Sequence, residues 1–186
     1  MARPYQALIK DCIKQKPQAQ RELYQLFAPK MMALCYRYAR DEANAEDILQ
    51  EGFIKIFQKI NKYDDRGSFE GWVRRIMVNT AIDHIRKQKH QQNEVEINEV
   101  ISEDVSESVL DKLEAEHLYE VIQQLPTGYR LVFNLYAIEG YSHKEIGEQL
   151  NITESTSRSQ YTRARAMLKR KIEELYMEQN IYKDVI

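Results

Sequence analysis

The chain has 186 residues and a formal net charge of −2, with 27 basic and 29 acidic side chains. This balance excludes a protein that coats nucleic acid with a uniformly basic surface, so any DNA contact must use local basic patches. Only 6 Gly and 4 Pro occur, which leaves few residues for hairpin turns and predicts an all-α protein. Two cysteines are too few for a disulfide scaffold or a zinc cluster. Residues 1–10 lack the long apolar region of a secretory signal, and no apolar run reaches the roughly 18 residues of a membrane span, so we expect a cytoplasmic protein.

Two stretches near the start of the chain have helical periodicity. Apolar residues recur every three or four positions over residues 17–39, and Pro29 is expected to separate two helices there. Asn44 and Asp47 have the spacing of a capping box, which predicts an amphipathic helix that continues to Ile60.

A polar turn at residues 63–67 follows, and Ser68 is expected to cap a further helix that closes the first domain, residues 1–89. The pattern then dissolves into Gln, Asn, Glu and Ser, with acids in excess over the single base Lys89. This composition predicts an extended acidic linker over residues 90–107, either a plain tether or a segment with a function of its own.

The second domain, residues 108–186, contains the most informative segment. Ser142 can cap a short helix, residues 151–153 can form a turn, and Thr153 can cap a longer helix that begins at Glu154. Gly147 lies where two helices would approach closely. The arrangement predicts a helix-turn-helix, in which the second helix enters the major groove of DNA.

The second helix of this motif is locally basic, although the chain as a whole is acidic. Arginine pairs with guanine, and hydroxyl groups donate to or accept from several bases. A basic helix alone is more often a solvated surface, but the capped helix and turn before it favour DNA binding. The candidate DNA-binding residues of this helix are Thr156, Arg158, Ser159, Thr162, Arg163 and Arg165.

The first domain contains a second basic helix, with aromatic residues at its start. Aromatic rings beside basic side chains are typical of proteins that stack on unpaired nucleotide bases and contact single-strand phosphates. Trp72 is expected to be mostly core, and the turn from Tyr63 to Phe69 is expected to be the more exposed surface. The candidate residues of this second surface are Tyr63, Arg66, Ser68, Phe69, Trp72, Arg75 and Asn79.

Three segments resemble, in the same order, the extracytoplasmic-function group of bacterial sigma factors, which keeps two helical domains called region two and region four. Residues 44–53 (NAEDILQEGF) resemble the polymerase-docking helix of that family, and residues 69–83 (FEGWVRRIMVNTAID) resemble its promoter-melting helix. Region four is matched by Leu125 with Pro126, by residues 140–147 (GYSHKEIG) and by residues 163–165 (RAR).

The resemblance implies a transcription initiation factor without catalytic activity or cofactor. Asp47, Gln50 and Glu51 would dock on core RNA polymerase. The loop from Tyr63 to Phe69, together with Asn79, would capture a flipped base of the minus-ten promoter element. The minus-thirty-five element would be read by Arg158, Ser159, Thr162 and Arg163. The other implied partner is an anti-sigma factor, often membrane-embedded. Many members carry a β-branched apolar residue after the threonine of the recognition helix, whereas Ser157 follows Thr156 here, so base preference does not transfer.

Two other classes of protein share parts of these patterns. A one-component repressor or a response-regulator output domain would use the same helix-turn-helix, but the acidic docking helix and the aromatic basic turn would have no role in it. An enzyme is disfavoured because the four histidines do not lie at metal-ligand spacing or beside a nucleophile, and no glycine-rich phosphate loop occurs. We therefore expect no small-molecule substrate.

Overall fold

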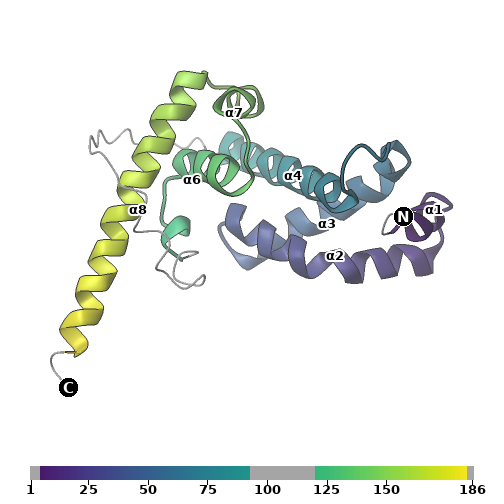
Figure 1. Ribbon diagram of the computed structural model, residues 1–186, viewed down its shortest axis with the longest axis horizontal. Coiled ribbons are helices and arrows are strands. Elements are labelled where there is room, and N and C mark those ends of the chain that lie inside the picture. The colour runs from purple at the N-terminus through teal and green to yellow at the C-terminus, as the bar shows by residue number, and fades with distance from the viewer. Residues whose placement is uncertain (1–4, 93–119, 184–186) are drawn as a thin grey trace. The chain divides into compact units, whose positions relative to one another are not determined.

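The computed structural model describes residues 5–92 and 120–183, with side chains described at 5–88 and 120–175. The chain divides into two compact units, Met1–Glu94 (unit 1) and Val95–Ile186 (unit 2). All regular elements within the described ranges are helical (Figure 1), which confirms the predicted all-α fold in two helical parts. The domain limits at 89 and 107 stay predictions, because most of the expected linker lies outside the described residues. Within the described ranges, no helix has the length and apolar character needed to cross a membrane.

Three long helices form the body of unit 1. Its elements are α1 (Gln6–Ile13), α2 (Pro17–Tyr38), α3 (Glu42–Lys59), the short 3-10 helix η1 (Ile60–Lys62) and α4 (Phe69–Gln92). Helices α2, α3 and α4 pack against one another, and α1 packs on α2. Each long helix contributes fully buried apolar side chains, among them Leu23, Met31, Ile48, Ile56 and Met77. Burial of one apolar face of each helix therefore holds unit 1 together.

The expectation that Pro29 separates two helices is wrong, because α2 continues through it. A proline inside a helix costs roughly 3 kcal/mol, since it removes a backbone donor and crowds the preceding turn. Pro29 itself is exposed, but Phe27 and Met31 on either side are each only 1% exposed. Packing of these side chains in the core of unit 1 offsets the local cost.

The capping box expected at Asn44 and Asp47 is also wrong, because α3 begins earlier. Asp41 is the N-cap, and its carboxylate accepts hydrogen bonds from the backbone N–H and the side-chain amide of Asn44, at 2.8 and 2.7 Å. These bonds hold the pKa of Asp41 below its ordinary value. Asp and Asn are both favoured as N-cap residues. Asp41 is the N-cap because it directly precedes the first residue of α3, whereas Asn44 lies inside the helix.

Unit 2 is built around its last helix. Its elements are α6 (Thr127–Phe133), the π-helical turn η3 (Asn134–Ile138), α7 (His143–Leu150) and α8 (Glu154–Lys183). Helix α8 packs against both α6 and α7. The core contains Val121, Ile122, Leu125, Tyr129 and Phe133 together with Ala164, Met167, Leu168 and Ile172 of α8.

Candidate nucleic-acid interface

Local capping positions α7 and α8, as the sequence predicts. Ser142 forms a complete capping box with Glu145, in which the backbone N–H of Ser142 donates to the Glu145 carboxylate at 2.8 Å. The Ser142 hydroxyl accepts from the Glu145 backbone N–H at 3.3 Å. Thr153 caps α8 by accepting from the backbone N–H of Thr156 at 3.0 Å. Both helix starts are therefore fixed by their own side chains.

Replacing Ser142 by alanine is expected to lower the stability of unit 2 by about 1 kcal/mol, because the hydroxyl that accepts from the Glu145 backbone N–H is lost, although the backbone N–H of residue 142 can still donate to Glu145. The measurement is the opening free energy of α7 from hydrogen exchange of the full chain. Ser155→Ala is the matched control, since this serine is exposed in the first turn of α8. Equal protection in the two variants would contradict the prediction.

The turn between α7 and α8 is tight and requires a glycine beside it. Asn151 adopts the left-handed conformation, with φ of 56°, and the backbone N–H of Ile152 donates to the carbonyl of Gly147 at 3.0 Å. A Cβ at Gly147 would lie 2.9 Å from the carbonyl oxygen of Ile152 and 3.4 Å from the backbone nitrogen of Glu154. Backbone atoms cannot give way as a flexible side chain can, so the predicted close approach at Gly147 is confirmed.

The early turns of α8 have a buried face and an opposite polar face. Ser157 and Ala164 are 0% exposed, and with half-buried Tyr161 and buried Leu168 they form one stripe at three- and four-residue spacing. The exposed side chains lie about half a helical turn away from this stripe; they are Ser155, Arg158, Ser159 and Thr162. The candidates Thr156, Arg163 and Arg165 are half-buried at the edges of the exposed face. Small hydroxyls flanked by arginines are suited to base edges and phosphates.

The exposed side chains of α8 make contacts within their own helix. The guanidinium of Arg158 donates to Glu154 at 2.5 Å, and the hydroxyls of Ser159 and Thr162 donate to the carbonyls of Thr156 and Arg158. These hydroxyls keep acceptor capacity for a ligand donor. The arginine must leave Glu154 before it can reach a base. Such an exposed ion pair contributes little stability, so the exchange has a small cost.

A second candidate surface lies at the start of α4. The hydroxyl of Tyr63 donates to the carbonyl of Gly67 at 2.8 Å and closes the loop before the helix, and Ser68 caps α4 by accepting from the backbone N–H of Gly71 at 3.0 Å. The predicted cap is confirmed. The side chain of Arg66 is 90% exposed, although it pairs with Asp64 at 3.2 Å.

The aromatic residues of this loop form one cluster. The ring centroid of Tyr63 lies 5.1 Å from that of Phe69 and 5.7 Å from that of Trp72, and Phe69 stacks on Trp72. Phe69 is only 3% exposed and rests on Phe27 at 5.7 Å, whereas Tyr63 and Trp72 are half-buried. Phe69 thus supports the two rings that a ligand can reach.

Arg75 and Asn79 extend the second surface along α4. Both are exposed and four residues apart, so they lie on one face of the helix, opposite the buried Val73 and Met77. The second surface therefore places an aromatic edge, a guanidinium and an amide along one helix.

A third surface is the outer face of α3, where the sequence predicts polymerase docking. Asp47 and Gln50 are exposed at helical spacing, and the same face continues to Ile54, which is 56% exposed. Sequence reasoning missed Ile54 as a contact residue; its signal is an apolar residue in phase with the exposed polar positions. An exposed large apolar residue at the centre of a polar face is typical of a protein-binding surface.

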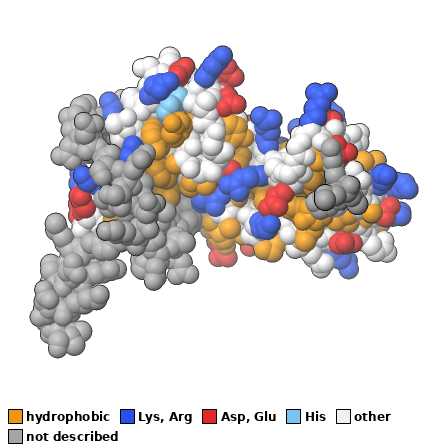
Figure 2. Space-filling model, in the orientation of Figure 1, with side chains coloured by type: hydrophobic (Ala, Val, Ile, Leu, Met, Phe, Trp, Pro, Cys, Tyr) orange, Lys and Arg blue, Asp and Glu red, His pale blue; other side chains and the backbone are white. Residues whose placement is uncertain are grey.

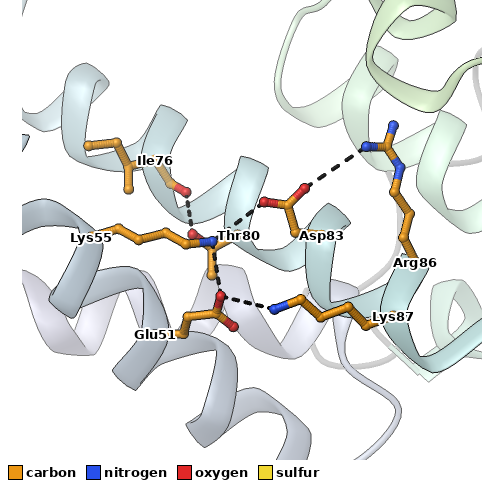
Figure 3. A network of polar contacts seen from close by, with 7 residues as sticks. All are labelled: Glu51, Lys55, Ile76, Thr80, Asp83, Arg86 and Lys87. Atoms are coloured by element: carbon orange, nitrogen blue, oxygen red, sulfur yellow. Dashed lines mark hydrogen bonds and ion pairs between the residues drawn. The ribbon is translucent and has the colours of Figure 1, made fainter.

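Glu51, the third predicted docking residue, is half-buried and belongs to an ion-pair network between α3 and α4 (Figure 3). Its carboxylate lies 3.0 Å from Nζ of Lys55 and 3.4 Å from Nζ of Lys87, and Lys55 also contacts Asp83 at 3.4 Å. Burial raises the pKa of Glu51, but the hydrogen bonds and charges of the two lysines outweigh it and lower the pKa overall. The negative charge of Glu51 is therefore already balanced by lysines of unit 1.

Positive and negative side chains are interspersed on the surface of the described residues. On the face that Figure 2 displays, Lys and Arg side chains alternate with Asp and Glu over the described residues. This distribution agrees with the nearly neutral formal charge. Contact with nucleic acid would thus depend on the particular groups of α4 and α8 rather than on a general positive field.

Comparison with known families and sequences gives matches in both units. Sigma-70 region 2 matches residues 23–91, and Sigma-70 region 4 matches residues 115–168. The ECF RNA polymerase sigma factor SigW of Bacillus subtilis is 34% identical over 184 residues, which cover 90% of this chain and 98% of SigW. The ECF RNA polymerase sigma factor SigE of Mycolicibacterium smegmatis is 32% identical over 80% of this chain and 59% of its own length.

Solved structures share the fold at lower identity. The sigma factor RpoE of Bartonella quintana, in complex with the anti-sigma factor NepR, is 18% identical with a TM-score of 0.53, over 82% of this chain and 96% of RpoE. CnrH, in complex with the cytosolic domain of CnrY, is 20% identical with a TM-score of 0.50, over 90% of this chain and 96% of CnrH.

Proposed function

The chain belongs to the extracytoplasmic-function sigma factors of RNA polymerase, and from that premise we propose that its two units bind two separate promoter elements through the surfaces described above. As a member of this family, the protein directs promoter-specific transcription initiation. Sigma factors are non-catalytic initiation factors, and we propose that this chain likewise catalyses no reaction, binds no cofactor or small-molecule substrate, and acts in the cytoplasm.

Unit 2 is proposed to read the minus-thirty-five element with α8. The observation that carries this assignment is the division of α8 into a buried stripe and an opposite face that contains Arg158, Ser159 and Thr162. A recognition helix must be held from behind while its other side enters the major groove. Thr156, Arg163 and Arg165, at the edges of that face, are placed to contact the flanking phosphates.

Unit 1 is proposed to capture and open the minus-ten element. Tyr63 and Trp72 offer ring edges for stacking, and Asn79 offers an amide that can pair with a base edge. Arg66 and Arg75 are exposed and can neutralise phosphates of the separated strand. Phe69 and Ser68 are assigned supporting roles, since one is buried under the cluster and the other caps α4.

Core RNA polymerase is proposed to dock on the α3 face formed by Asp47, Gln50 and Ile54. Glu51 would contribute through the network that joins it to α4 rather than as a free carboxylate. With both units attached to one polymerase, binding of the first promoter element raises the effective concentration of the second unit at its own site. This linkage explains how a chain of near-neutral charge can still act on DNA.

The remaining proposed partner is an anti-sigma factor, either soluble or anchored in the membrane. The solved complexes of RpoE with NepR and of CnrH with CnrY support this proposal by analogy of fold. Such a partner would keep the factor inactive by covering the side chains proposed to contact DNA, several of which are exposed on α4 and α8.

Run-off transcription tests the proposed function. Core bacterial polymerase is incubated with a pooled library of promoter-like templates, with and without the protein. We expect discrete transcripts only when the protein is present, and their start sites identify both promoter elements. Absence of transcripts, together with tight binding of the protein alone to duplex DNA, would instead indicate a repressor.

A further inference from the structure

A buried polar contact joins the two helices of the helix-turn-helix. Nδ1 of His143, the first residue of α7, lies 2.9 Å from Oγ of Ser157 in the first turn of α8. His143 is 8% exposed and Ser157 is 0% exposed. A buried polar pair is costly to break, because each group would lose its partner without gaining water.

Aromatic rings fix the orientation of the imidazole. The ring of Tyr136, from η3, stacks on His143 with centroids 4.1 Å apart and planes 9° apart. Tyr161 of α8 contacts both rings, at 5.8 Å from His143 and 4.5 Å from Tyr136. The imidazole is therefore held between two elements and aims its Nδ1 atom at α8.

We propose that His143 is a positioning residue for recognition of the minus-thirty-five element, because its hydrogen bond to Ser157 fixes the rotation of α8 about its own axis. The inference rests on the proposed function of unit 2. Ser157 lies on the buried stripe of α8, one residue before Arg158 and two before Ser159. Any rotation at Ser157 turns the exposed face by the same angle, and recognition tolerates only roughly 10–20° of error.

Apolar packing alone would not fix this rotation as sharply. The fully buried side chains near the start of the stripe are small, since Ser157 is followed by Ala164, and the larger Tyr161 between them is only half-buried. Hydrogen bonds are directional, so the pair His143–Ser157 adds an angular constraint that contact between small side chains lacks.

The buried position of His143 disfavours its protonated form. Burial lowers the pKa of His143, the nearby Arg158 lowers it further, and Glu154 partly offsets both. The titratable groups that contact the ring are Tyr136 from η3 and Tyr161 from α8. The unfolded chain takes up its proton near the ordinary value of about 6.5. The folded unit binds fewer protons there, so its stability is complete above that pH and falls as the pH decreases below it.

The test compares four variants in run-off transcription on a selected promoter, in the full chain with core polymerase. His143→Phe keeps the ring stack and loses the hydrogen bond, whereas His143→Asn places an amide where Nδ1 lies. Ser157→Ala removes the bond from the other side, and His143→Phe with Ser157→Ala removes both partners. The readout is the ratio of transcription from the intact promoter to that from one with a scrambled minus-thirty-five element.

We expect His143→Phe and Ser157→Ala each to lower this ratio about fivefold, the effect of one net hydrogen bond. The double variant should be no worse than either single one, because both remove the same interaction. His143→Asn should recover most of the ratio, which a purely structural role of the ring would not allow. Glu148→Gln, an exposed change on α7, is the control and should leave the ratio unchanged.

Three results would overturn the proposal: ratios equal to that of the unmodified protein, multiplicative losses in the double variant, or no recovery with His143→Asn. A second readout is the opening free energy of α7 and α8 from hydrogen exchange, which should fall between about pH 7.5 and 5.5 in the unmodified protein and less in His143→Asn. Equal pH dependence of this free energy in the unmodified protein and in His143→Asn would also contradict the proposal. Failure of the proposed function is distinguishable, because the unmodified protein would then give no dependence on the minus-thirty-five element at all.

Discussion

Gly147→Val is expected to abolish transcription that depends on the minus-thirty-five element while polymerase still binds through unit 1. The new side chain would meet the backbone of Ile152 and Glu154 within the turn that joins α7 to α8. Overpacking by a single group typically lowers stability by about 1–3 kcal/mol, which is the loss expected for Gly147→Ala. Valine adds two further methyl groups, so its loss should be larger. The measurements are run-off transcription and the opening free energy of α8 from hydrogen exchange.

Gly52→Ala is the matched contrast for Gly147→Ala, since both glycines lie inside helices. At Gly52 a Cβ would overlap the sulfur and terminal methyl of Met77, but these atoms are the far end of a flexible side chain that can shift. We expect a smaller loss of stability there, partly offset by the better helix propensity of alanine. Equal losses at the two positions would show that backbone crowding beside the turn is not the cause.

Asn79→Ala is expected to lower transcription from duplex promoters by roughly tenfold, because one amide-to-base pairing contributes about 1–3 kcal/mol. On a template already mismatched and open at the minus-ten element, the loss should become smaller, since capture of the base no longer has to offset its unstacking. The measurement is the ratio of run-off product from the two templates at equal polymerase occupancy.

Arg163→Ala is the companion variant for this experiment. It should impair the same promoter, but its defect should persist on the open template because the minus-thirty-five element remains duplex. Polymerase binding should stay intact in both variants. Loss of polymerase binding in either, or the same response of both to the open template, would contradict the division of roles between the units.

Local signals in the sequence predict much of the helix-turn-helix. Ser142, Thr153 and Gly147 act through residues three to seven positions away, so the spacing of residue types suffices to place them. Ser68 is of the same kind, because it caps the helix that follows it directly. Sequence reasoning is strong where cause and effect lie within two helical turns.

The errors arise where tertiary packing decides. Pro29 breaks an isolated helix, but burial of Phe27 and Met31 keeps α2 continuous. Asn44 has the residue type of a cap, yet Asp41 takes that role. Instead, the side-chain oxygen Oδ1 of Asn44 accepts from the side-chain amide of Gln88 and lies 3.0 Å from Nε2 of His84 in α4. These outcomes depend on which helices become neighbours.

Contacts over long sequence separation could not be predicted at all. Glu51 and Lys87 are 36 residues apart, and His143 and Ser157 are 14 apart. The family resemblance assigns Glu51 to polymerase docking, and the local pattern places Ser157 on the recognition helix. Nothing in either local pattern indicates the cation or the imidazole that the fold brings to it.

Trp72 is the single tryptophan of the chain and belongs to the aromatic cluster with Tyr63 and Phe69. The intrinsic fluorescence of the protein at tryptophan wavelengths therefore originates entirely from the surface proposed to meet the opened strand. Because the indole is half-exposed, its emission responds when water beside the ring is replaced by a stacked base. Promoter opening can thus be followed in real time with unlabelled protein and DNA, provided that the tryptophans of the polymerase are replaced or subtracted.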